Sequence, residues 1–228
     1  MGKRTWHGGE YLDDEPAPEA GGLDTKPKSL AASERNEEQR ADWREPMKQW
    51  EATPLVVVDE SGSNIALTPL YARAPKGQRA TETVPRNRGK KTPVIASLTL
   101  EGIGASRIIE GAANGAAFEA SVEPILAPSL QKGQIVVLDN LRVHKSAGGR
   151  QRIEEKGCQL RFLAAYSPDF SPIEEAFSKL KTGLRRRQAR TREALEEAIA
   201  QELLPITSPD AQGWFEHCGS PCSEQRMS

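Results

Sequence analysis

The sequence lacks any apolar run of the roughly 20 residues that a bilayer-spanning helix needs. Its first thirty residues also lack the apolar block of a secretory signal. Cysteine is scarce: Cys158, Cys218 and Cys222 form an odd set in a chain too long to depend on disulfides. We therefore expect a soluble, cytoplasmic protein with no membrane partner.

Histidine is equally scarce, and the cluster of His217, Cys218 and Cys222 has two interpretations. One is half of a zinc site, but no second pair of ligands stands at a suitable distance. The other is a poorly packed tail, which we favour.

Aromatic residues make up only 5% of the chain, and the mean hydropathy is -0.60. This composition fits one globular core within 228 residues, together with some poorly packed sequence. Residues 1–28 are rich in Gly, Pro and acids without periodicity, which predicts disorder. We expect a loosely docked linker helix in residues 29–53, the folded core in residues 54–216 and a disordered tail in residues 217–228.

Charge is distributed unevenly, although the total is only -1. Residues 1–53 hold 8 Lys and Arg against 12 Asp and Glu, so the remaining chain carries +3. Residues 73–91 contain seven cations and one acid, and residues 179–192 contain seven cations and no acid. Such clusters favour contact with nucleic-acid phosphates, and an ordinary solvated face is the alternative.

Strand and helix patterns alternate along the core, which predicts an α/β fold. The β-branched run Leu55–Val58 predicts a central strand buried on both faces. Residues 65–73 and 93–100 predict two more strands of a meander, and residues 118–126 have helical spacing. The remaining expected elements are a buried strand (135–138), a helix (145–156), a short strand (159–163) and two helices (172–187 and 191–204).

Each of the two buried strands ends in an aspartate, Asp59 and Asp139. If the strands are parallel neighbours, both carboxylates reach the same edge of the sheet, where open α/β folds bind ligands. Two close carboxylates repel each other unless a cation lies between them, which indicates a divalent metal. For either residue alone, ordinary turn chemistry is the alternative.

A third acid lies where a Pro-rich segment opens the first of the last two helices. Ser171 suits the N-cap, and Pro172 suits the first helical position. At about 100° per residue, Glu174 and Lys181 lie together beside the apolar stripe, whereas Glu175 points away. Glu174 is the expected metal ligand, and complementing the helix dipole is its alternative role.

Three blocks of the chain read Val-Val-Val-Asp-Glu-Ser-Gly, Val-Val-Leu-Asp-Asn-Leu-Arg-Val-His-Lys and Tyr-Ser-Pro-Asp-Phe-Ser-Pro-Ile-Glu. In these blocks the chain resembles the bacterial insertion-sequence DDE transposases of the mariner superfamily. The 34 residues between Asp139 and Glu174 match the spacing of that superfamily. The resemblance extends from about Ser29 to Gly219 and implies a ribonuclease-H-like mixed sheet flanked by helices.

The resemblance also implies the chemistry. Asp59, Asp139 and Glu174 would hold two Mg²⁺ or Mn²⁺ ions, which prefer oxygen ligands. Two such ions activate the attacking oxygen and stabilise the leaving one, so that water cuts a transposon end and the freed 3′-hydroxyl joins target DNA. A homo-oligomer on DNA, associated with the bacterial nucleoid, is implied as well.

Expected contacts with the DNA backbone come from both basic stretches and from one histidine. They are Lys90, Lys91, His144, Lys181, Arg185, Arg186 and Arg187. His144 follows Asp139 closely enough to approach the metal site or a phosphate, and a solvated loop histidine is its alternative. Glu60, next to Asp59, is a weaker candidate for the site.

Two functions from different classes follow. The first, which we expect, is an active transposase catalytic domain. The second is a non-catalytic remnant that binds DNA weakly or inhibits an intact transposase. Relatives carry a helix-turn-helix region before the core, and residues 1–28 match no part of it, which favours the remnant. The three blocks do not favour a third candidate, a structure-specific nuclease of the same fold.

Overall fold

The computed structural model describes residues 5–7, 10–12, 32–47, 54–109, 122–140 and 147–220. The chain divides into two compact units, residues 1–31 and 32–228. In the first unit, β1 (Thr5–His7) pairs antiparallel with β2 (Glu10–Leu12). The sequence pattern, which predicts disorder here, does not anticipate this pairing. Threonine, tryptophan and tyrosine favour strands, a local signal that the Gly- and Pro-rich composition hides.

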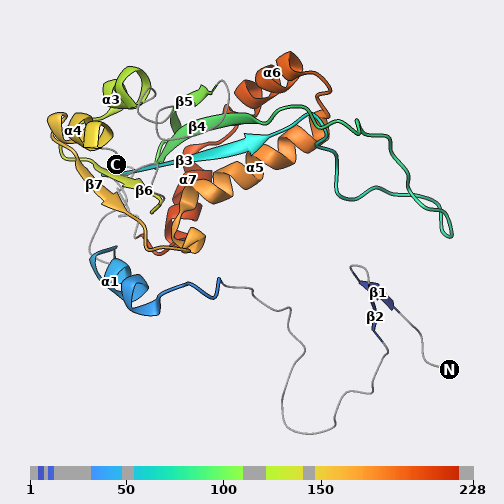
Figure 1. Cartoon of the computed structure of the whole chain (residues 1–228), viewed down its shortest axis with the longest axis horizontal. Coiled ribbons are helices and arrows are strands. Elements are labelled where there is room, and N and C mark those ends of the chain that lie inside the picture. Colours follow the sequence, from blue (N-terminus) through green and yellow to red (C-terminus); the bar gives the residue numbers. More distant parts are fainter. Residues whose placement is uncertain are drawn as a thin grey trace, which may run out of the picture. The chain divides into compact units, whose positions relative to one another are not determined.

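A five-stranded mixed sheet forms the centre of the second unit, in the order β5-β4-β3-β6-β7 (Figure 1). The pair β3 and β4 and the pair β4 and β5 are antiparallel, whereas β3 and β6, and β6 and β7, are parallel. The strands are β3 (Leu55–Ser63), β4 (Thr92–Thr99), β5 (Gly102–Ile108), β6 (Ile135–Leu138) and β7 (Gln159–Phe162). The predicted α/β class with a mixed sheet is confirmed.

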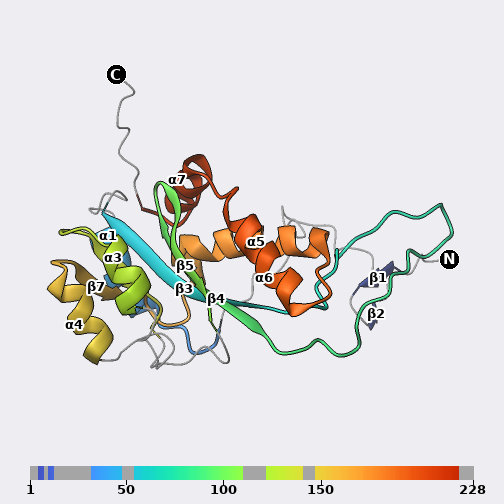
Figure 2. The same ribbon diagram turned by 90° about the horizontal axis from the view of Figure 1, so that it is seen from above.

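Helices cover both faces of this sheet (Figures 1 and 2). Within the described part of the chain, no helix is long and apolar enough to cross a membrane. One face carries α5 (Pro172–Arg187), α6 (Arg192–Leu203) and α7 (Ser208–His217), and the other carries the π-helical turn η1 (Val122–Leu126), α3 (Ala127–Ser129) and α4 (Ala147–Glu155).

The side chains of β3 alternate between two cores, as the period of a strand requires. Leu55 and Val57 belong to the cluster that α5 closes, and Val56 and Val58 belong to the cluster on the α4 side. Both faces of β3 are therefore buried, as the unbroken β-branched run predicts.

The meander differs from the prediction in two of its strands. Residues 64–91 contain no strand, so the strand predicted for residues 65–73 is wrong. The third strand is β5, which the prediction misses because Gly102 and Gly104 weaken a strand pattern. A Cβ at Gly104 would lie 2.8 Å from Ser97 Oγ, so glycine there permits the close approach of β5 to β4.

The prediction also misses α7. The backbone N–H and the hydroxyl of Thr207 each donate to Asp210 Oδ2 at 2.9 Å, a capping arrangement that the Thr-x-x-Asp spacing signals. Phe215 then anchors the helix in the core. Cys218 is only 7% exposed and Ser220 only 2%, so these two residues of the predicted poorly packed tail are buried, whereas His217 and Gly219 are exposed. Cys222 lies outside the described residues.

A first helix, α1 (Glu37–Met47), is shorter than the predicted linker and firmly anchored. The Arg40 side chain is 0% exposed and donates to both Asp169 oxygens, at 2.9 and 2.6 Å. Its guanidinium also lies 4.0 Å from the ring centroid of Phe170. Asp169 and Phe170 form the turn η3 (Pro168–Phe170) just before α5. Sequence indicates loose docking because arginine in a polar helix is normally exposed.

Candidate active site

Asp59 lies within β3, and Asp139 directly follows β6. The parallel register pairs the residues immediately before them, so the two aspartates hold corresponding positions on strands about 4.8 Å apart. Val57 and Val137, two residues earlier, belong to the core cluster closed by α5. Because side chains alternate along a strand, Asp59 and Asp139 lie on the α5 side of the sheet.

The third acid comes from the first turn of α5. Pro172 holds the first helical position and Ser171 is the N-cap, as predicted, although the Ser171 hydroxyl makes no capping bond. The Glu174 N–H instead donates to the Ser171 backbone oxygen at 3.1 Å. Ile173 and Phe177 are buried against the sheet, which leaves Glu174 exposed beside the apolar stripe.

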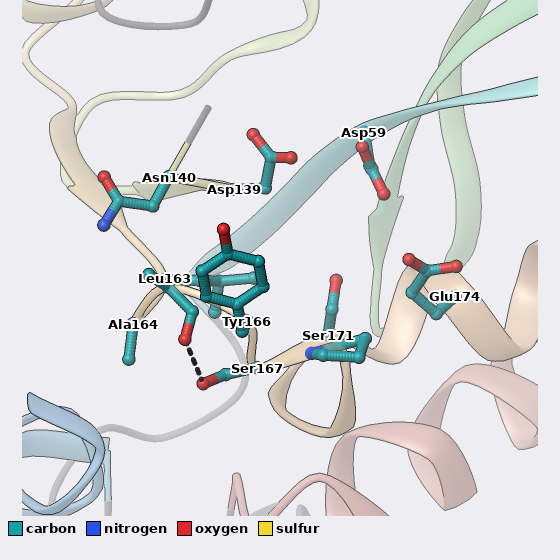
Figure 3. Close-up of a pocket in the computed structure, with 11 residues that line it drawn as sticks. Asp59, Asp139, Asn140, Leu163, Ala164, Tyr166, Ser167, Ser171 and Glu174 are labelled. Carbon is teal, nitrogen blue, oxygen red and sulfur yellow. Dashed lines mark hydrogen bonds between the residues drawn. The ribbon is translucent and has the colours of Figure 1, made fainter. Parts of the chain in front are cut away.

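One cavity of about 370 Å³ collects all three acids (Figure 3). Asp59 contributes from β3, Asp139 and Asn140 from the end of β6, and Glu174 from α5. The rest of its wall is the loop after β7 and the start of α5, namely Leu163, Ala164, Ala165, Tyr166, Ser167, Pro168 and Ser171. The cavity therefore lies beyond the carboxyl ends of the parallel strands, as open α/β folds favour.

Negative charge accumulates in this cavity. Burial, together with the smaller effects of the neighbouring charges of Asp139, Glu174 and Glu60, raises the pKa of Asp59 from 3.8 to about 7. The Glu60 N–H donates to Asp59 Oδ1 at 2.7 Å, which opposes the rise. A cation that entered the cavity would stabilise the charged form of the Asp59 carboxyl, which burial and the neighbouring acids disfavour.

The donor chemistry of the cavity suits a hard divalent cation, since three carboxylates supply only oxygen. In the described residues, however, no group of three or more His, Cys, Asp or Glu side chains is arranged to hold a metal ion. Carboxylates that share a cavity repel one another, and the exposed Glu174 side chain has room to change rotamer. The predicted ligands thus share a cavity without forming a finished site.

Two neighbouring acids lie elsewhere. Glu60 follows Asp59 on β3, so strand alternation directs it to the opposite face, and it does not line the cavity. Glu175 Oε1 lies 2.5 Å from Nδ1 of His217, on α7. The helical spacing therefore separates Glu174, which lines the cavity, from Glu175, which joins two helices.

The basic stretch on α5 is partly neutralised by acids from other helices. Lys179 pairs with Asp210 at 2.6 Å, and Arg187 pairs with Glu202. Among the predicted DNA contacts on this helix, Lys181 and Arg185 are partly buried, Arg186 is exposed, and Arg187 is engaged by α6. Residues 179–192 contain no acid in the sequence, but these ion pairs reduce the net positive charge of the stretch in the folded protein.

Residues 64–91 extend away from the sheet (Figures 1 and 2). All seven Lys and Arg residues of this segment are exposed to solvent. The base of this segment is fixed, because Arg190 Nη1 donates to the backbone oxygens of Ile65 and Leu67 at 3.0 and 2.8 Å. Lys90 and Lys91 lead into β4 from this segment. His144 lies outside the described residues.

Sequence reasoning omits two residues of the cavity wall, Asn140 and Tyr166. Asn140 directly follows Asp139, so adjacency is a usable signal for it. Tyr166 belongs to the Tyr-Ser-Pro-Asp block, but its left-handed backbone, with φ 55, has no signature in the sequence.

A family profile described as DDE superfamily endonuclease matches residues 54–196. The matched range contains Asp59, Asp139, Glu174 and the whole five-stranded sheet. The chain belongs to the DDE endonuclease superfamily. Comparison with curated protein sequences gave no match.

Among solved structures, the chain is similar to Mos1 mariner transposase. The paired-end complex with left transposon end has a TM-score of 0.70 at 20% identity, over 86% of this chain and 63% of that chain. The paired-end complex with Mn gives 0.69 at 20% identity, over 87% and 63%. The catalytic domain alone gives 0.57 at 14% identity, over 85% and 91%.

The chain therefore spans less than two thirds of the Mos1 chains in those complexes and nine tenths of the separate catalytic domain. At such low identity the likeness establishes the fold alone. That fold is the ribonuclease-H-like fold of transposase catalytic domains, which confirms the predicted architecture.

Proposed function

We propose that this chain is a transposase catalytic domain that cuts the ends of a transposon and joins them to target DNA. The observation that carries the proposal is the single cavity shared by Asp59, Asp139 and Glu174, with the two aspartates at corresponding positions of parallel strands. Membership of the DDE endonuclease superfamily supports it.

The three carboxylates would hold two Mg²⁺ or Mn²⁺ ions, which supply activation of the attacking oxygen and stabilisation of the leaving oxygen. Asp59 and Asp139 fix two ligand positions on rigid strands, and Glu174 approaches from α5. The loop after β7 forms most of the remaining cavity wall. No side chain needs to act as a nucleophile, because water attacks in cutting and a DNA 3′-hydroxyl attacks in joining.

The proposed partners are transposon-end DNA and a target duplex, held by a homo-oligomer of the chain. The exposed cations of residues 73–91 and the basic face of α5 supply contacts for phosphates, whose neutralisation dominates such binding. A paired-end complex of the similar Mos1 transposase contains transposon-end DNA, which supports this assignment.

A nicking assay tests the proposal. Supercoiled plasmid is incubated with the full chain and Mg²⁺, Mn²⁺ or a chelator, and we expect nicking only with a metal. Asp139→Asn and Glu174→Gln should reduce nicking to background without lowering the melting temperature, because the amides keep the shape but lose the charge that holds hard cations. Glu175→Gln is the matched control and should nick normally, since Glu175 contacts His217 instead.

Two results would redirect the assignment. A chain that binds DNA but nicks with neither metal is the non-catalytic remnant. Full nicking by Asp139→Asn or by Glu174→Gln would remove that residue from the mechanism.

A further inference from the structure

Tyr166 combines three features that the chemistry of the three acids does not use. It lines their cavity, its side chain is 56% exposed, and its backbone lies in the left-handed region at φ 55. A bulky aromatic residue in that region is strained, and strained residues persist where the surrounding structure fixes them.

The fold does not need an aromatic ring at this position. The ring belongs to neither core cluster, and its hydroxyl has no hydrogen-bond partner among the residues that the structure describes. Glycine or asparagine would adopt the same backbone conformation more readily. The left-handed turn therefore presents the Tyr166 ring at the cavity, where Figure 3 shows it among the residues of the wall.

Anchors on both sides hold the backbone of the loop that carries this ring. Before it, the Leu163 N–H donates to the Leu138 backbone oxygen at 2.8 Å, which ties the loop to β6. After it, the two hydrogen bonds from the buried Arg40 hold Asp169. Tyr166 lies three residues from each anchor, so its backbone is fixed between them and directs the ring to the cavity.

We propose that Tyr166 stacks on a nucleobase of the DNA substrate, the one next to the phosphate that the three acids bring to reaction. This inference rests on the proposed function. A base is favoured over a phosphate because an uncharged aromatic ring stacks on a planar base, whereas phosphates are bound mainly by cations. Stacking on an aromatic ring also tolerates any sequence. To reach the ring, the base must leave the duplex stack, which costs least at a mismatch, a nick or a missing partner.

Three variants of the full chain test the stacking in the plasmid assay with Mn²⁺. Tyr166→Phe keeps the ring and should nick within about twofold of the parent. Tyr166→Gly should nick about 5- to 150-fold more slowly, because stacking is worth ~1–3 kcal/mol per base at 1.36 kcal/mol per tenfold change. Tyr71→Gly removes a 91% exposed ring that does not line the cavity and should leave nicking unchanged. The melting temperature of Tyr166→Gly should not fall, since glycine relieves the strain.

A second step separates stacking from a structural role. Cut positions are mapped on labelled duplexes, and the base beside the cut is then replaced by an abasic site. On the abasic duplex, the parent and Tyr166→Gly should nick at the same rate, because no base remains for the ring to stack on. The stacking proposal would be overturned if the difference in nicking rate persisted on the abasic duplex, or if Tyr166→Gly nicked plasmid as fast as the parent. A parent chain that neither nicks nor binds DNA with Mn²⁺ would overturn the proposed function as well.

Discussion

Asp59→Asn should stabilise the metal-free protein while destroying its proposed activity. The Asp59 carboxyl is partly buried and lies near two further carboxylates, so its charged form is disfavoured. Asparagine has the same shape and can still accept the hydrogen bond from the Glu60 N–H through its side-chain oxygen. The substitution therefore removes a costly charge and little else.

The magnitude follows from the pKa of Asp59, which rises from 3.8 to about 7 in the fold. Because the folded pKa is raised, the parent has its full stability below about pH 4 and loses stability as the pH rises toward 7. At 1.36 kcal/mol per pKa unit, the loss above pH 7 is at most ~4 kcal/mol. Since the asparagine amide must itself be hydrogen-bonded in the cavity, we expect ~1–3 kcal/mol.

The assay is urea unfolding of both proteins at pH 5 and pH 8 with a chelator present. The two free energies of unfolding should differ more at pH 8 than at pH 5, with the variant the more stable. Added Mn²⁺ should stabilise the parent, as any ligand of the native state does, and should stabilise the variant less. Equal stabilities at pH 8 would show that the three carboxylates do not crowd one another, and the reasoning about the cavity would fail.

Three further predictions concern residues around the site. Asp169→Asn should lower the free energy of unfolding by ~1–3 kcal/mol in urea titrations, because it leaves the fully buried Arg40 with only the exposed Glu37, 3.5 Å from its Nε, as a charged partner. Arg40→Met should cost less, since Asp169 is half exposed, and equal losses would contradict this asymmetry. The hydrogen bond from Lys179, with those from Thr207, lowers the pKa of Asp210 to about 2. Asp210→Asn should therefore destabilise the protein by ~1 kcal/mol at pH 7 and not at pH 2, as thermal unfolding across pH would measure. A difference in stability between parent and variant that stays constant with pH would refute this. In fluorescence-anisotropy titrations of any duplex, replacing Arg185 and Arg186 by Ala should flatten the salt slope by up to ~0.9 per lost phosphate contact, whereas Arg192→Ala, whose side chain pairs with Glu196, should leave it unchanged.

The parts of the fold that depend on local signals could be predicted from the sequence. Helix α5 begins at Pro172 and ends at Arg187, as the proline at its first position and the apolar period indicate. Strand β6 matches its four-residue β-branched run. Asp139 and Glu174 line the cavity at places that local signals indicate, a strand end and a helix start. Asp59 lines it too, but the prediction that its strand ends there is wrong, because β3 continues to Ser63 through its pairing with β4. Their role as metal ligands stays a prediction.

The parts that depend on distant partners could not be predicted. Two glycines hide β5, whose strand is stabilised by its pairing with β4. The charge of the α5 stretch depends on Glu202 and Asp210, which lie outside it. The burial of Arg40 depends on Asp169, and no spacing rule links positions so far apart.

That separation has a consequence for the order of folding. Arg40 and Asp169 lie 129 residues apart, and a contact of such span closes only after the intervening chain has formed its own structure. During synthesis, α1 leaves the ribosome early but finds no partner until the η3 turn follows, because its polar sequence buries little by itself. The loop along the cavity is therefore anchored to α1 only after the η3 turn has been made, although α1 is one of the first segments of the core to leave the ribosome.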